Sequence, residues 1–167
     1  MELRSNSYIT VRESVEILLG LFGGEAWNEV SIEVQKRALN TATMRIDTLQ
    51  NLCGGFIGEK TDDAQILEFP RTTTDNQIPN DVKRATAMEA LFIISSADAT
   101  DRIGSAIKAG LKSKTVGNAS ESYATASELD NKGMKKYLGS DDAIALMKKY
   151  LIFSGYLQYL IQLSLQR

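Results

Sequence analysis

Apolar residues recur at helical spacing near the start of the chain. Thr10-x-x-Glu13 fits a capping box, in which both side chains accept hydrogen bonds from backbone N–H groups at a helix start. The apolar positions that follow predict a helix over about 11–22 with Phe22 in its apolar stripe, ended by Gly23 and Gly24.

Three further helices follow from the same periodicity. The second covers about 31–52, the third begins after Pro79 and covers about 80–98, and the fourth is capped by Ser140 and ends near 150 or 151. A continuation of the third over 100–109 also fits the pattern. The expected apolar face of the second helix is Val34, Ala38, Leu39, Ala42, Ile46 and Leu49.

The segments between the helices are expected to be irregular or extended. Glycines make 53–63 a loop, and 65–69 is a brief extended segment stopped by Pro70. Residues 112–127 lose the helical period around Gly117-Asn118, which fits a tight turn and predicts a β-hairpin. The polar residues of 129–139 predict a mobile connection.

The final fifteen residues are rich in large apolar side chains. Alternation from 156 onward suits a strand, while Phe153, Tyr156 and Leu160 would share one face of a helix, so both conformations stay open. A free tail of this kind would expose apolar surface that soluble monomers avoid. We therefore expect it to fold back on its own domain or, in the favoured interpretation, to dock on another chain.

Length and charge narrow the class of protein. The 167 residues (18.4 kDa) suit one domain, and 19 basic against 21 acidic residues give a net charge of -2 without a polybasic block, which disfavours tight autonomous DNA binding. Histidine is absent and Cys53 is the only cysteine, so no metal site, cofactor or disulfide is expected. We expect a cytoplasmic product without a secretory signal or a membrane-spanning segment.

No residue set marks a catalytic centre, so we expect no catalytic residues and no enzyme. The adjacent carboxylates Asp62-Asp63 and Asp141-Asp142 are best explained as a solvated turn and a helix start, and the glycines of 54–58 lack the ending of a phosphate-binding loop. Cys53 is interpreted as a small apolar filler.

Two residues have competing interpretations. Trp27 is expected in the core, with an exposed interface anchor as the alternative. Arg71 is expected to pair with Asp47 or Glu68 of its own chain, with a partner's carboxylate as the alternative.

A spaced set of short motifs covers much of the chain. Trp27 is followed by Ala38-Leu39-x-x-Ala42-Thr43-x-x-Ile46-Asp47, then by the run 65–71, and then by Ile78-Pro79-x-x-Val82-Lys83. Their order, with Val116-Gly117-Asn118 after them, resembles the head-to-tail adaptor (connector) proteins of tailed bacteriophages. We call the following positions the signature residues: Trp27, Ala42, Asp47, Gln65, Phe69, Pro70, Arg71, Pro79 and Lys83.

The resemblance implies a mainly α protein: a small helical bundle over 1–151 with a projecting hairpin, and an extended C-terminal arm over 152–167. It implies a structural neck protein that forms a ring of about twelve copies between the portal and the stopper or tail-completion protein. Double-stranded DNA would pass through the ring, and the protein would lie in the virion neck after assembly in the host cytoplasm.

The resemblance also implies contact residues. In the portal-docking arm these are Tyr150, Phe153, Tyr156, Leu157, Tyr159, Leu160, Ile161, Leu163, Leu165 and Arg167. In the hairpin they are Lys114, Val116, Gly117, Asn118, Ser120 and Tyr123.

A competing interpretation is single-stranded DNA binding, because some similar sequences carry a primosome-like label. Such binding needs aromatic residues interleaved with cationic ones. The aromatic residues of this chain do not interleave with Lys and Arg except at Lys135-Lys136-Tyr137 and Lys148-Lys149-Tyr150, so the adaptor interpretation is favoured over this one.

Overall fold

The computed structural model describes residues 6–52, 54–108 and 133–152, with only the backbone of 97–108. The helices are α1 (Val11–Leu18), α2 (Glu25–Asn28), α3 (Ile32–Thr48), α4 (Asn80–Lys108) and α6 (Asp141–Met147). Short 3-10 turns cover Leu49–Asn51, Thr72–Thr74 and Lys148–Tyr150. Mainly helical architecture is therefore confirmed.

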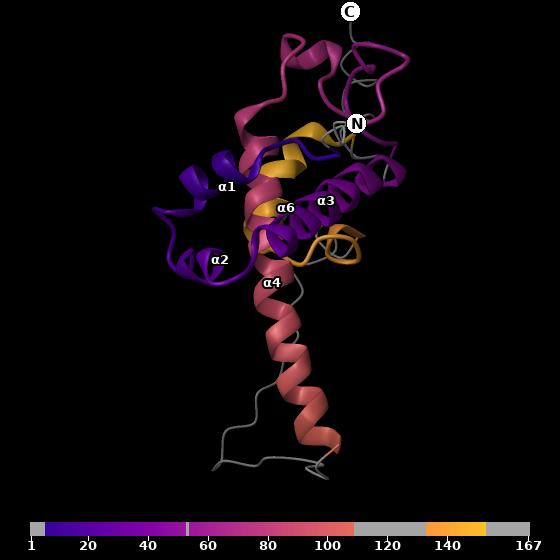
Figure 1. The fold of residues 1–167 in the computed structure, drawn as a ribbon. Coiled ribbons are helices and arrows are strands. Elements are labelled where there is room, and N and C mark those ends of the chain that lie inside the picture. Colours follow the sequence, from indigo (N-terminus) through magenta and orange to yellow (C-terminus); the bar gives the residue numbers. More distant parts are fainter. Residues whose placement is uncertain (1–5, 53, 109–132, 153–167) are drawn as a thin grey trace, which may run out of the picture.

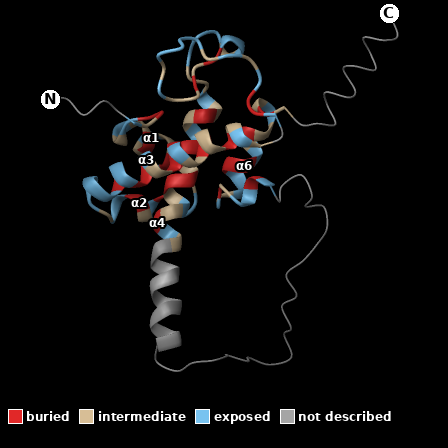
Figure 2. Ribbon diagram, turned by 90° about the vertical axis from the view of Figure 1, so that its right-hand side faces the viewer, coloured by how far each residue is buried: buried red, intermediate tan, exposed pale blue. Residues whose placement is uncertain are grey.

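Helix α4 is the central element. Figure 2 shows α1, α2 and α3 on one side of it and α6 on the other, while the loop that connects α3 to α4 lies at one end of the bundle. The second half of α4 extends away from the other labelled helices (Figure 1). Alanines at 85, 87 and 90 are fully buried, which allows neighbouring helices to approach α4 on several sides.

Buried side chains form two clusters along α4. One cluster packs the end of α3, the loop after it and α6 around Phe69, whose ring makes edge-on contacts with Tyr8, Phe56 and Tyr150. The other packs α1, α2 and the start of α3 around Trp27, which is fully buried. Trp27 is thus a core residue, as predicted, and not an exposed anchor.

Several predicted helix boundaries are confirmed. Thr10 and Glu13 form the capping box of α1, and the side chains of Ser31 and Ser140 cap α3 and α6. The third predicted helix and its possible continuation form one helix, α4. Helix α1 ends at Leu18, four residues earlier than expected, and Phe22 is fully exposed instead of packed inward.

Other expectations were wrong or fall on residues that the structure does not describe. No strand is present in the described ranges, only the isolated bridges Phe56–Leu151 and Lys60–Arg71, and the expected extended segment 65–69 bends over 66–68. The predicted hairpin at 112–127 is not supported and lies outside the described residues, as do Cys53 and the arm from 153 onward. Part of the expected mobile connection is core, since Met134 and Leu138 are buried.

Candidate functional site

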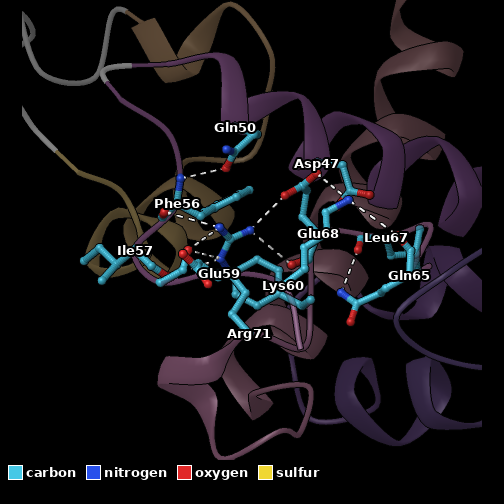
Figure 3. A network of polar contacts seen from close by, with 12 residues as sticks. Asp47, Gln50, Phe56, Ile57, Glu59, Lys60, Gln65, Leu67, Glu68 and Arg71 are labelled. Carbon is cyan, nitrogen blue, oxygen red and sulfur yellow. Dashed lines mark hydrogen bonds and ion pairs between the residues drawn. The ribbon is translucent and has the colours of Figure 1, made fainter. Parts of the chain in front are cut away.

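Arg71 organises a polar network at the loop end of the bundle (Figure 3). Its Nη1 donates to the Glu68 carboxylate at 2.8 Å, and its Nε donates to the carbonyl oxygens of Ile57 and Gly58, both at 3.2 Å. Lys60 pairs with the second Glu68 oxygen at 3.1 Å. Arg71 is buried and holds its own loop, so the expected internal pair is with Glu68 and a partner's carboxylate has no access.

Asp47 lies beside this network on α3. The Tyr8 hydroxyl donates to its carboxylate and accepts from the backbone N–H of Phe69 at 3.2 Å. Burial raises the pKa of Asp47 to about 6 and also raises the pKa of Tyr8, although the hydrogen bond from Tyr8 opposes the shift at Asp47. The pair ties the N-terminal segment to α3 and to the loop.

Other signature residues also make contacts within the fold. The Gln65 amide donates to the carbonyl oxygens of Leu67 and Pro70, at 2.7 and 3.0 Å. Lys83 on α4 pairs with Glu13 on α1 at 3.0 Å. Phe69 and Ala42 are core residues, and Pro79 precedes the first turn of α4. These positions therefore have structural roles that require no partner.

Among the described residues, the most exposed aromatic side chains lie elsewhere, where the turn after α1 meets α4 and the start of α6. A hollow of about 400 Å³ opens there, which we call the phenylalanine hollow. Its lining includes Phe22, Met88, Phe92, Ser140 and Asp142. This volume lies within the range of small-ligand sites, roughly 300–1,000 Å³.

A buried carboxylate supports one wall of the hollow. Glu89 is fully buried, and its oxygens accept hydrogen bonds from Arg45 Nη1 at 2.7 Å, from Gly139 N at 3.0 and 3.1 Å, and from Ser140 N at 2.9 Å. The Phe92 ring lies against Gly139 so closely that a Cβ there would be 1.9 Å from the ring. Glu89 therefore fixes the backbone on which Phe92 rests.

Two lysine–tyrosine pairs flank α6. Lys136 Nζ lies 5.8 Å from the centre of the Tyr137 ring, and Lys149 Nζ lies 5.2 Å from the centre of the Tyr150 ring. Lys149 also bonds Asp81, and this hydrogen bond raises the pKa of Lys149, whereas burial raises the pKa of Tyr150. Each pair places a cation beside a partly buried phenol ring.

The described part of the chain offers neither a cluster of metal ligands nor a membrane-spanning helix. It holds no group of three or more side chains that could ligate a metal ion. Within the same ranges, no helix has the length and apolar character needed to cross a bilayer.

The chain matches one protein family over nearly all of its length. The family is described as "Putative DnaT-like ssDNA binding protein", and the match covers residues 2–161. The chain belongs to this family. No curated protein and no solved structure matches it.

Membership in the DnaT-like family overturns the adaptor interpretation. The expected identity as a head-to-tail connector, the role as a virion neck ring and the partners portal, stopper and passing double-stranded DNA were wrong. The error has a physical cause. Signature residues such as Arg71 and Lys83 form ion pairs that hold the loop and the helices together, so their spacing indicates a fold and does not identify a partner.

The expected contact residues are largely untested. Those of the hairpin, and those of the arm after Tyr150, lie outside the described residues of this DnaT-like protein. Tyr150 packs edge-on against Phe69 at 5.5 Å between ring centres. The phenylalanine hollow was not predicted from the sequence, although Glu89, the lone acid within an otherwise apolar stretch of helix, indicates its buried support.

Proposed function

We propose that this protein binds single-stranded DNA and acts by binding and not by catalysis. The observation that carries the proposal is the family match over residues 2–161. A cytoplasmic location, expected from the lone cysteine, belongs to the same proposal.

The surface around α6 supplies the chemistry that unpaired DNA requires. Bases stack on aromatic rings, and phosphates are attracted by cations beside those rings. The pair Lys136–Tyr137 offers both groups before α6, while after α6 Lys149 lies beside the Tyr150 ring but also bonds Asp81. A duplex keeps its bases stacked within the helix, so the same surface favours single strands.

The charge of the chain sets the expected strength of binding. A net charge of -2 provides no long-range attraction for phosphates, so local cations and stacking must supply the affinity. We therefore expect micromolar binding with a weak salt dependence, because few phosphates are neutralised.

Fluorescence anisotropy with a labelled oligothymidylate tests the proposal directly. Lys136→Ala should weaken binding and lower the slope of log affinity against log salt by about 0.7, the value for one phosphate contact on a single strand. Lys36→Ala is the matched control, because Lys36 is exposed in the second turn of α3 and makes no ring contact in the described residues. Absence of binding by the unsubstituted chain at low salt refutes the proposal.

A further inference from the structure

The phenylalanine hollow has an aromatic floor that is held in place before any ligand arrives. Phe92 keeps 40% of its surface exposed while Gly139 packs against its ring. The contacts of Glu89 with the backbone of Gly139 and Ser140 and with Arg45 fix this arrangement. A ring fixed in this way loses little side-chain freedom when a planar group stacks on it.

The rim of the hollow adds specific polar chemistry. Asp142 and Ser140 line it from the start of α6, and Asp142 has no hydrogen bond or ion pair within the described ranges. Phe22 lines it from the turn after α1 and is fully exposed. The hollow thus combines two aromatic rings with an unengaged carboxylate.

A cation lies on the same face of α4. Arg84, Met88 and Phe92 are spaced four residues apart, which places them in one row along the helix. Arg84 is exposed and has no ion pair within the described residues. It is therefore free to bind a phosphate next to a group held in the hollow.

We propose that the phenylalanine hollow is a base-binding site that takes one unpaired nucleobase, stacks it on Phe92 and selects bases that carry an amino group. This inference rests on the proposed single-stranded DNA binding. The Asp142 carboxylate accepts a hydrogen bond from an exocyclic amino group, such as N4 of cytosine. Thymine offers only one N–H, flanked by two carbonyl oxygens that repel a carboxylate.

The negative charge at the rim also orients the nucleotide. A carboxylate repels phosphate groups, so the base and not the backbone enters the hollow. The phosphate is left outside, where Arg84 lies on the same face of α4. The acidic rim is thus compatible with a polyanionic ligand because only the base edge meets it.

Titration of the full chain with labelled oligocytidylate and oligothymidylate of equal length tests the inference. The unsubstituted chain should bind oligocytidylate roughly tenfold more tightly, the low end of what one base contact discriminates. Asp142→Ala should abolish this preference. Asp141→Ala is the matched control. It removes the same charge from the neighbouring residue, whose carboxylate pairs with Lys135, and it should leave the ratio of the two affinities unchanged.

Substitutions of the aromatic floor separate stacking from folding. Phe92→Leu should weaken oligocytidylate binding roughly tenfold, whereas Phe92→Tyr, which keeps the ring, should retain most of the affinity. Circular dichroism of each variant reports whether the helices remain folded. If both folded variants bind as the unsubstituted chain does, the hollow is not the base site.

The outcomes separate this inference from the function on which it rests. Equal affinity for the two oligonucleotides in the unsubstituted chain overturns the base site and leaves single-stranded DNA binding intact. Failure to bind either one overturns both. A change of oligomeric state in Phe92→Leu, measured by sedimentation, with no change in DNA affinity identifies the hollow as a protein contact and also overturns the base site.

Discussion

Removal of the Glu89 carboxylate should destabilise the protein more than removal of any surface acid. The side chain is fully buried and accepts hydrogen bonds from Arg45, Gly139 and Ser140. In Glu89→Ala, two backbone N–H groups lose their acceptor, at a cost of about 1–3 kcal/mol each. Arg45 contributes less to the loss, because its side chain is 38% exposed and regains water.

The sum is a loss of about 3–5 kcal/mol in the free energy of unfolding, the range for breaking a buried ion pair. For a chain of this size it corresponds to a fall in Tm of roughly 6–20 °C. Urea denaturation followed by circular dichroism measures the first quantity, and calorimetry measures the second. Glu89→Gln keeps the volume and one acceptor oxygen, so its loss should be smaller.

A matched surface substitution provides the comparison. Glu16 pairs with Arg12 at 3.4 Å, but the two side chains are 66% and 91% exposed, so Glu16→Ala should change stability by about 0.5 kcal/mol or less. Arg45→Ala should fall between this and Glu89→Ala. A Glu89→Ala protein within about 1 kcal/mol of the unsubstituted chain would show that the carboxylate does not hold the Gly139–Ser140 backbone.

Three more substitutions test other contacts. The pKa of Asp47 is about 6 in the fold against 3.8 for a free carboxyl. The free energy of unfolding is therefore highest below pH 3.8 and falls as the pH rises to 6, because the folded protein binds the proton more tightly. Asp47→Asn should make this fall smaller by about 1–2 kcal/mol, as measured by urea denaturation across this pH range. Arg71→Lys should cost about 2–4 kcal/mol in thermal unfolding, because an ammonium cannot reach Glu68 and the loop carbonyls together. Gly139→Ala should cost about 1–3 kcal/mol, and less when combined with Phe92→Leu, since the added methyl meets that ring.

Helix starts were the most predictable part of the fold. The side chains of Thr10 and Ser140, both predicted as caps, accept a hydrogen bond from a backbone N–H three residues later, and Ser31, predicted only as a helix start, does the same. This chemistry depends only on near neighbours in the chain, so it can be recognised without knowledge of the tertiary structure.

Burial along the helices was less predictable. Val34 was expected on the inner face of α3, yet it is exposed, while the neighbouring Gln35 is buried and donates to the carbonyl oxygen of Trp27 at 2.7 Å. The acceptor lies in the short helix α2, so the sequence of α3 alone does not indicate that Gln35 is buried. The burial of Met134 and Leu138 was likewise not predicted, because they lie in a polar segment of the sequence. They become core residues by packing in one cluster with α6 and the loop.

The phenylalanine hollow could not be predicted, because three distant segments form it. Phe22 comes from the turn after α1, Phe92 from α4 and Asp142 from α6. Periodicity places Phe22 inward on an extended α1, but the helix ends at Leu18 and the next turn carries the ring into solvent. An exposed aromatic therefore arises from an early helix end, which hydrophobic patterning does not reveal.

The resemblance to adaptor proteins led to the wrong function because the signature residues serve the fold. The residues that line the hollow are different ones. Arg71 and Trp27 are buried and make contacts within their own chain, so their roles in the fold do not depend on what the protein binds. A partner contacts exposed groups; those that we propose for DNA are Phe92, Asp142 and Lys136, and none of these belongs to the signature. Substituting Arg71 should therefore change stability and DNA affinity together, whereas Asp142→Ala should change base preference at nearly constant stability. If Asp142→Ala instead unfolded the chain, the distinction between structural and contact residues would be wrong.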